Sequence, residues 1–322
     1  VFSRSYGFVK LKNIPKPFKV HRVYNNEIEY SIDNPDSLRS LLDSRNVNIV
    51  QSDDIVLDYK TIAFLYPENL GDKNQEFFCF EFLQQLINDS NKIELIRSPS
   101  ITDIIKMNDQ KNNLTEISRK LAVENIAELS LLCLDEKFKV NIAVKSMNTG
   151  LIIYEESFDS DISDIRSVTG KIMVEIATIF NLDVSDHLKK IFKQKVDVDN
   201  KAYKLFLEGK SLSTKVKDSE SLDNSKLKLK EAISIDDEFI QAYAALGLTY
   251  SLLGDYEEAE EHLETALDLS EDIDNIEILS FVFGYLGIFY KKLKKIKKSI
   301  KYFEKAIKAQ KKIGSKIELS TL

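Results

Sequence analysis

The chain has 322 residues, of which 43% are hydrophobic and 30% charged, and its formal net charge is −7. This composition excludes a disordered chain and, at this length, predicts two or three globular domains. No apolar run approaches the roughly 18 residues of a membrane helix, and the first residues lack the apolar core of a signal peptide, so we expect a cytoplasmic protein without a membrane segment.

Residues 1–24 have the pattern of a strand pair that is too short to bury a core of its own. Residues 7–23, Gly-Phe-Val-Lys-Leu-Lys-Asn-Ile-Pro-Lys-Pro-Phe-Lys-Val-His-Arg-Val, alternate around a proline-containing corner. The string resembles the hairpin that closes the catalytic domain of class III nucleotide cyclases, with His21 where that family commonly has tyrosine. The resemblance implies an upstream domain that uses Mg²⁺ or Mn²⁺ and dimerises to form its active site.

Residues 25–59 are acidic and rich in Asn and Ser, which predicts a linker. Residues 60–186 then carry alternating strand and helix signals, which predict an α/β domain with a mixed sheet. The expected strands are 61–66, 92–97, 125–134, 138–145 and 151–157, and the expected helices are 75–91, 113–122 and 165–181.

The order of these elements resembles the TolB-type amino-terminal domain. The resemblance rests on the strings Ile62-Ala-Phe-Leu-Tyr-Pro-Glu-Asn-Leu70, residues 116–123, and Met147-Asn-Thr-Gly150. Ala122 stands where that family usually has glycine. In cytoplasmic proteins the family implies no catalysis, and it usually joins an enzyme or output domain to a helical repeat array.

Residues 187–322 contain an internal repeat. Tyr243, Leu246, Gly247, Tyr250, Ala259, Leu263 and Ala266 recur forty residues later as Phe283, Leu286, Gly287, Tyr290, Ser299, Phe303 and Ala306. The pattern resembles the tetratricopeptide repeat, a helix pair that stacks into an all-α solenoid and binds proteins. A degenerate repeat at Gly209, Leu212, Leu229 and Ala232 precedes the pair, and a truncated fourth is expected after Gly314.

The step of forty residues exceeds the usual repeat of about 34 by roughly six. The additional residues fall near 270–276 and are expected to lengthen the second helix or the turn that follows it.

The resemblance implies that the first helices line a concave groove. We expect repeat two to contribute Gln241, Ala244, Leu248, Ser251 and Leu252 to this groove, and repeat three to contribute Phe281, Gly284, Ile288, Lys291 and Lys292. Such a face is apolar with a basic end, and it suits an amphipathic protein segment with acidic flanks.

Charge along the array is strongly divided. Residues 231–290 contain fifteen Asp and Glu and no Lys or Arg, whereas residues 291–316 contain twelve lysines and only Glu304. The lysines could bind an acidic partner, nucleic acid or lipid headgroups, or they could be solvated and lie near the carboxylates of the neighbouring repeat. Arginine is absent there and aromatic residues are few, so no nucleic-acid partner is expected.

No catalytic, cofactor-binding or metal-binding residue is assigned within the chain. It has three histidines and no Cys-x-x-Cys, and Cys79 and Cys133 are expected to be buried free thiols. The functional hypothesis is therefore a regulatory, protein-binding region of a bacterial class III cyclase in cyclic-nucleotide signalling. The alternative is a stand-alone tetratricopeptide adaptor without cyclase activity.

Overall fold

The computed structural model describes residues 2–9, 18–24, 49–50, 59–108, 113–194, 197–215, 218–271 and 275–313. The chain divides into two units, Val1–Asp58 and Tyr59–Leu322. The truncated repeat expected after Gly314 lies outside the described residues.

The first unit contains an antiparallel strand pair. β1 (Phe2–Val9) pairs with β2 (Phe18–Tyr24), from Phe2 opposite Tyr24 to Val9 opposite Phe18. This confirms the expected strand pair. A short strand, β3 (Ile49–Val50), pairs with the other edge of β1, so the sheet order is β2-β1-β3. Part of the segment expected to be a linker therefore belongs to this sheet.

The second unit begins with a mixed sheet, as expected. Its strand order is β6-β4-β7-β8-β9. β4 lies parallel to β6 and β7, while β7, β8 and β9 form an antiparallel meander. The strands are β4 (Lys60–Phe64), β6 (Ile96–Arg97), β7 (Asn125–Leu134), β8 (Lys137–Ser146) and β9 (Ile152–Asp161), and β5 (Glu68–Asn69) pairs with β7.

Two hairpin turns join the antiparallel strands, as the sequence predicts. Asp135 and Gly150 adopt φ of 52° and 73° in these turns. The strand expected at 92–97 is shorter, because Lys92 still belongs to the preceding helix and only Ile96 and Arg97 pair with β4.

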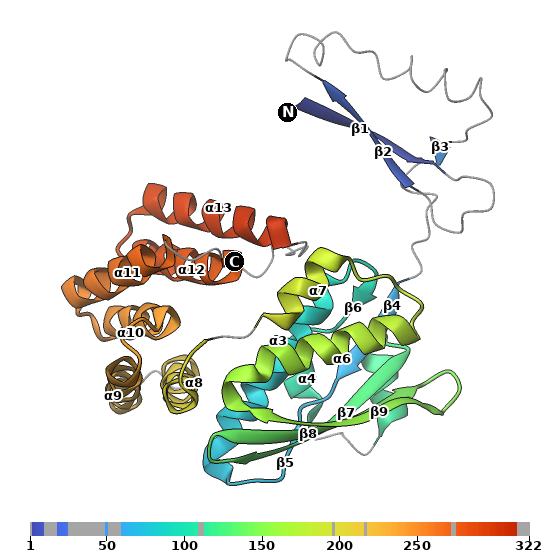
Figure 1. Cartoon of the computed structure of the whole chain (residues 1–322), viewed down its shortest axis with the longest axis horizontal. Coiled ribbons are helices and arrows are strands. Elements are labelled where there is room, and N and C mark those ends of the chain that lie inside the picture. The colour runs from blue at the N-terminus through green and yellow to red at the C-terminus, as the bar shows by residue number, and fades with distance from the viewer. Residues whose placement is uncertain are drawn as a thin grey trace. The chain divides into compact units, whose positions relative to one another are not determined.

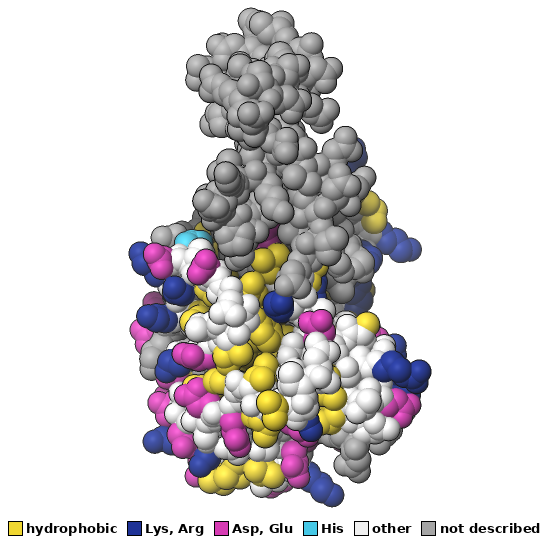
Figure 2. Space-filling view, turned by 90° about the vertical axis from the view of Figure 1, so that its right-hand side faces the viewer, with side chains coloured by type: hydrophobic (Ala, Val, Ile, Leu, Met, Phe, Trp, Pro, Cys, Tyr) yellow, Lys and Arg dark blue, Asp and Glu magenta, His cyan; other side chains and the backbone are white. Residues whose placement is uncertain are grey.

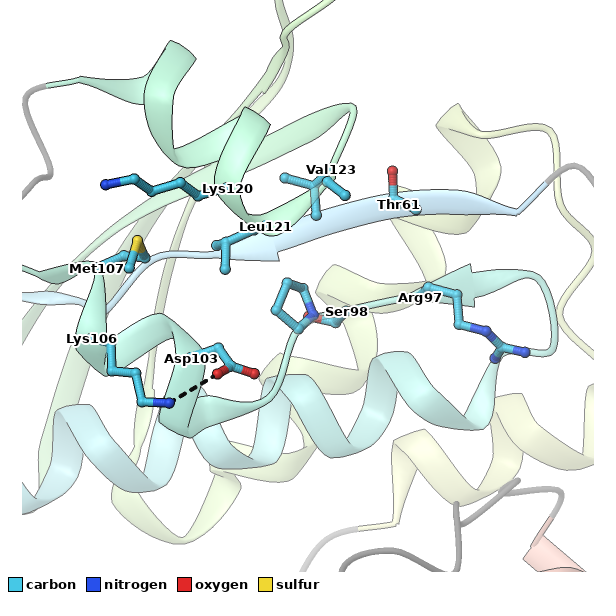
Figure 3. A pocket seen from close by; sticks show the side chains of 11 residues that line it. Thr61, Arg97, Ser98, Asp103, Lys106, Met107, Lys120, Leu121 and Val123 are labelled. Carbon is cyan, nitrogen blue, oxygen red and sulfur yellow. Dashed lines mark hydrogen bonds and ion pairs between the residues drawn. The ribbon is translucent and has the colours of Figure 1, made fainter.

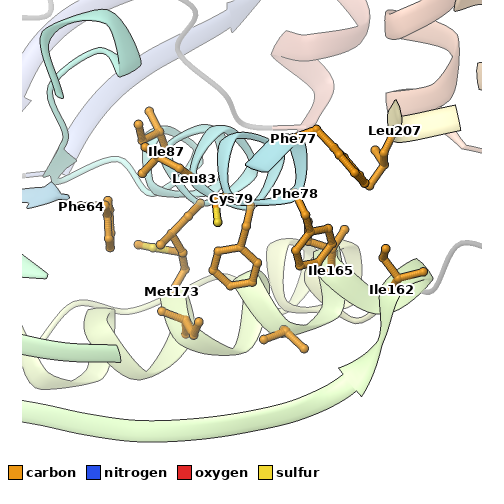
Figure 4. Packing of buried hydrophobic residues seen from close by; sticks show 14 of the residues in the cluster. Phe64, Phe77, Phe78, Cys79, Leu83, Ile87, Ile162, Ile165, Met173 and Leu207 are labelled. Atoms are coloured by element: carbon orange, nitrogen blue, oxygen red, sulfur yellow. The ribbon is translucent and has the colours of Figure 1, made fainter. Parts of the chain in front are cut away.

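Helices α3 (Glu76–Lys92) and α6 (Ile165–Ile179) pack against each other and against the sheet (Figure 1). Figure 4 shows part of this core. Phe138 of β8 lies 5.0 Å from the ring of Phe78 and 5.9 Å from that of Phe82, which anchors α3 to the sheet. Shorter elements complete the domain: η2 (Lys73–Gln75), α4 (Ile101–Lys106), α5 (Leu114–Leu121), η4 (Ile162–Asp164) and α7 (Asp186–Lys193).

Three helix pairs follow, which confirms the all-α array. They are α8 (Asn200–Lys215) with α9 (Ser219–Ile235), α10 (Ile240–Leu253) with α11 (Tyr256–Glu271), and α12 (Ile276–Lys292) with α13 (Ile296–Ile313). Among the described helices, none is both long and apolar enough to cross a membrane. Cys79 and Cys133 are both buried thiols outside any disulfide, as expected.

Hydrophobic side chains are not confined to the core. On the face shown in Figure 2 they form a band between charged side chains. The most exposed large apolar residues of the α/β domain include Leu134, Leu151 and Ile152. Leu151 precedes β9, the edge strand of the sheet, and Ile152 begins it. Glu155, Glu156 and Asp159 of β9 put charge along that edge.

Candidate protein-binding groove

Three glycines set the close approach within the helix pairs. A Cβ built on Gly247 would lie 2.7 Å from Leu263 Cγ, and one built on Gly209 would lie 2.7 Å from Leu229 Cγ. At Gly287 the same Cβ would lie 2.6 Å from the ring of Phe303. Real Cβ atoms do not approach this closely, so only glycine fits, as the repeat pattern predicts.

Serine hydroxyls hold two of these pairs together. Ser225 donates to the carbonyl of Gly209 at 2.8 Å, and Ser299 donates to the carbonyl of Gly287 at 2.9 Å. The corresponding residue of repeat two is Ala259, which is fully buried. Repeat one is therefore built like the others, although its sequence is degenerate.

The residues expected in the groove differ widely in exposure. Ala244 and Ser251 are fully buried, and Gln241, Leu248, Leu252, Phe281 and Gly284 are half-buried. Ile288 is 41% exposed, and Lys291 and Lys292 are also exposed. The accessible members thus gather toward the carboxyl end of α12.

Lys292 is not a free cation. Its Nζ donates to the backbone carbonyl of Ser251 at the end of α10 and lies 5.9 Å from the ring of Tyr256. Burial lowers the pKa of Lys292 from its usual value. Its position ties the second and third repeats together, which leaves Lys291 as the exposed cation of the predicted pair.

The α/β domain covers another part of the first helices. Lys210 of α8 follows Gly209, so it is the equivalent of Leu248, which follows Gly247 in repeat two. The Nζ of Lys210 lies 2.8 Å from Oε2 of Glu81 in α3. Burial by itself would lower the pKa of Lys210, but the Glu81 carboxylate outweighs burial and raises it. Figure 4 shows Leu207 of α8 beside Phe77 of α3. The inner side of repeat one is thus a domain interface.

A second contact joins α12 to the same domain. Glu277 accepts from Lys92 Nζ at 2.7 Å and forms an ion pair with Arg166 of α6. Lys92 also lies 2.8 Å from the fully buried Asp89, which accepts a hydrogen bond from Thr169 at 2.7 Å. Each charge in this network therefore lies beside an opposite charge, as buried charges require, while the buried Nε of Arg166 has no hydrogen-bond partner among the described residues.

The turn that carries Glu277 comes from the additional residues of the repeat. α10 begins at Ile240, and the residue forty positions later is Ser280, yet α12 begins one turn earlier at Ile276. Asn275 caps this turn by accepting from the backbone N–H groups of Glu277 and Ile278. Four of the additional residues thus lengthen the following first helix, and α11 ends at Glu271, two residues beyond the equivalent of Ile235 at the end of α9. The expected longer second helix is confirmed to that extent, and residues 272–274 of the turn lie outside the described residues.

The sequence patterns described above do not predict this interface. Two features of the sequence point to it. One is the excess of roughly six residues between repeats two and three, and the other is Lys210, at an inner position where repeat two has the apolar Leu248. Its other members, Glu81, Lys92 and Arg166, follow no spacing that sets them apart from surface charges.

Two of the described lysines of α13 contact aromatic rings rather than the carboxylates of α11. Among the described residues no ion pair joins the two helices; instead Lys298 Nζ lies 4.8 Å from the ring of Tyr290, and Lys305 Nζ lies 5.0 Å from that of Phe283. Cation–π contacts leave the ammonium groups in solvent, so the positive charge of α13 is not neutralised at close range.

The α/β domain also has a cavity of about 480 Å³ between α4 and α5 (Figure 3). Two of its cations have carboxylate partners, Lys106 with Asp103 at 3.4 Å and Lys120 with Glu116 at 2.8 Å. Within the described part of the chain, no group of His, Cys, Asp and Glu could hold a metal ion.

Comparison with known proteins identifies the repeats. Residues 240–273 and 286–313 match the tetratricopeptide repeat family. The structure of TolB from Acinetobacter baumannii aligns with 38% of this chain at 12% identity and a TM-score of 0.27, and this chain covers 28% of its length. The structure of MamA aligns with 47% of this chain at 18% identity and a TM-score of 0.27, over 79% of its own length. No curated protein matches the sequence.

The chain therefore contains tetratricopeptide repeats behind a mixed α/β domain. The first match covers the second helix pair, and the second match covers the third pair from Leu286 onward. It includes Ile288, Lys291 and Lys292 of the predicted groove, whereas Phe281 and Gly284 precede it. Arrays of this type act in protein–protein interaction.

Proposed function

We propose that the chain is a protein-binding module whose docking site is the part of the groove that the α/β domain leaves uncovered. We call this part the open groove; it consists of Leu248, Leu252, Gly284, Ile288 and Lys291. The contacts of α3 and α6 lie at Lys210, which also has Tyr285 of α12 nearby, and at the first turn of α12. The open groove extends from the middle of α10 and α12 to their carboxyl ends.

The observation that carries the proposal is the environment of Gly284. A Cβ built there meets no atom within 4 Å, in contrast to the three packed glycines of the array. A glycine inside a helix costs about 0.5–1 kcal/mol relative to alanine, and no contact with the described part of the chain explains its presence. A partner backbone that approaches the helix closely would use the missing side chain.

The chemistry of the open groove defines its partner. Leu248, Leu252 and Ile288 offer apolar contact, and the exposed Lys291 supplies positive charge at one end. The partner is therefore a protein segment with apolar anchors and an acidic flank, and its affinity falls as salt rises because Lys291 takes part.

Selection from a displayed library of random peptides tests this proposal. Peptides that bind the chain should combine apolar residues with Asp or Glu at one end. Synthetic versions should lose about tenfold or more in affinity against Gly284→Leu and against Ile288→Ser. The matched control is Leu227→Ser, which changes a side chain that is 63% exposed on α9, outside the groove. Selected peptides that bind all these variants equally would refute the open groove.

A second candidate function, regulation of a class III nucleotide cyclase, is favoured by the sequence of the first strand pair. Its support is the string from Gly7 to Val23, together with the order of strand pair, α/β domain and repeats. In this proposal, partner binding to the array biases dimerisation of catalytic domains whose Mg²⁺ or Mn²⁺ ligands precede Val1. The stand-alone adaptor is the competing account.

Cyclase assays separate these accounts. Residues 1–322 should make no cyclic nucleotide from ATP or GTP with Mg²⁺ or Mn²⁺, whereas the reading frame extended upstream of Val1 should do so. Changing either of two upstream metal-binding aspartates should abolish this activity. An upstream frame without a cyclase domain would leave the adaptor.

A further inference from the structure

The contact between successive repeats recurs at one position of the second helix. Lys226 of α9, Glu260 of α11 and Ile300 of α13 are equivalent in the repeat, at spacings of 34 and 40 residues. Lys226 Nζ lies 5.9 Å from the ring of Tyr250 in the following α10. Glu260 accepts a hydrogen bond from the hydroxyl of Tyr290 in the following α12 at 2.9 Å. Each of these two residues thus holds the tyrosine of the next first helix.

At α13 the same position is uncovered. Ile300 is 52% exposed, and Ile296, the equivalent of Tyr256, is 56% exposed. Tyr256 contacts Lys292 of the next first helix, whereas no described helix follows α13 in the stack. Two isoleucines on one side of a helix, four residues apart, form an apolar stripe. We call this stripe and its flanking lysines, Lys297, Lys301 and Lys308, the terminal face.

The flank of the terminal face is basic. Its three lysines are exposed, and none forms an ion pair with a described residue; Glu304 is the one exposed carboxylate of α13 beside them. The face therefore occupies the position of an inter-repeat contact, with lysines where α11 has Glu257, Glu261 and Asp268 at the equivalent positions. A helix that covers it needs apolar side chains for the isoleucines and carboxylates for the lysines.

We propose that the terminal face binds a helix of another protein that carries an apolar stripe and an acidic flank. The occupant lies where a first helix lies in the preceding repeats, so the contact continues the interface between repeats. A second copy of this chain fits less well. Its acidic helix, α11, exposes Glu257, Glu258, Glu261 and Glu264, with Tyr256 as its one exposed large apolar side chain. Those carboxylates would leave the isoleucines without apolar partners.

The test uses a labelled helical peptide of about 20 residues, built from Ala, Leu and Glu with leucines at i, i+3, i+4 and i+7. Its matched control has Lys in place of Glu. Fluorescence anisotropy with the full chain should show binding of the Glu peptide that weakens as salt rises. The Lys peptide should bind at least about tenfold more weakly, because its charge repels the terminal face.

Variants of the exposed residues locate the site without endangering the fold. The double change Ile296→Ser and Ile300→Ser should weaken the Glu peptide about tenfold or more, and Lys297→Glu with Lys301→Glu should also reduce the salt dependence. Leu227→Ser, on α9, should have no effect, and Gly284→Leu should have none either, which separates this face from the open groove. The proposal would be overturned if both peptides bound equally, or if the Ile296→Ser, Ile300→Ser variant kept its affinity for the Glu peptide. It would also be overturned if a second copy or residues 314–322 covered the face and prevented peptide binding.

Discussion

The same residue type has opposite roles within this array. Gly209, Gly247 and Gly287 lie where a methyl group would collide with the second helix, whereas Gly284 faces open space. The repeat pattern identifies the packed glycines from sequence, because their spacing from the small and aromatic positions recurs. The pattern assigns Gly284 to the groove but does not reveal the open space beside it, because an unpacked glycine has no steric signature in one sequence.

Substitution of Gly247 should therefore destabilise the chain, and that of Gly284 should not. Gly247→Leu and Ala266→Leu overpack the contact between α10 and α11 and should each cost about 1–3 kcal/mol or more. Gly284→Leu is the matched control, and its thermal midpoint should stay the same or rise because leucine favours helix. Parent-like melting of both Gly247→Leu and Ala266→Leu would contradict the repeat assignment.

His262 makes the second repeat sensitive to acid. Its ring stacks on Tyr250 at 5.3 Å, as the equivalent Tyr302 stacks on Tyr290 at 5.5 Å. Burial lowers the pKa of His262 below its usual 6.5. The unfolded chain thus takes up this proton first as pH falls, so His262 costs no stability above pH of about 6.5 and destabilises the fold below it.

The change His262→Tyr should remove this contribution. Between pH of about 7.5 and about 5.5, roughly one unit either side of the usual histidine pKa, the thermal midpoint of both proteins can be compared. The midpoint of the parent should drop more over this range than that of the variant. Differential scanning fluorimetry of both proteins in the same buffers measures the difference. Identical pH dependence would mean that the ring is already solvated in the folded state.

At the scale of elements, the first turn of α12 distinguishes repeat three. Asn275 caps the turn, and Glu277 joins it to Lys92 of α3 and Arg166 of α6. The additional residues of the repeat thus form a contact with another domain rather than a loose loop. The length of the insertion is visible in the sequence, but its partner lies 185 residues away along the chain.

Glu277→Gln should weaken this contact strongly. The substitution removes the negative charge that Arg166 and Lys92 face in their buried positions. Removing one partner of a buried ion pair typically lowers the free energy of unfolding by about 3 kcal/mol. Amide hydrogen exchange should then become faster in α12 and at the end of α3, because the contact between the two domains opens more often. The cap at Asn275 is unchanged, so α12 should remain helical. A variant of the exposed Glu264 on α11, Glu264→Gln, is the control and should exchange like the parent. Equal exchange in both variants would show that the ion pairs do not hold the domains together.

At the scale of the whole molecule, the α/β domain and the array share one apolar core. Buried residues of α3, α6, α8, α10 and α12 belong to a single continuous cluster within Tyr59–Leu322. The Glu81–Lys210 and Glu277–Lys92 pairs lie within this joint region. A continuous core unfolds cooperatively, so the two parts should behave as one unit.

Calorimetry of the chain tests this coupling. Tyr59–Leu322 should unfold in one transition, and the double charge change Lys210→Glu with Glu277→Lys should split it into two, because each substitution places like charges together at the interface. Restoring one pair by adding Glu81→Lys to the double variant should bring the transitions closer again. Two transitions in the parent would mean that the domains fold independently.

The sequence by itself determined the elements whose signal is local or periodic. Repeating Gly, Ala and aromatic positions specify helix pairs because each must meet its own neighbour within about forty residues. The meander of β7, β8 and β9 is visible because its turns at Asp135 and Gly150 are short.

Only the tertiary structure decided which part of the groove is available. The contacts of Lys210 with Glu81 and of Glu277 with Lys92 join residues more than a hundred positions apart. A charged residue on a helix has the same appearance in sequence whether water or a distant carboxylate neutralises it. The same reason hides the terminal face, because the exposure of Ile296 and Ile300 depends on what the rest of the fold leaves uncovered.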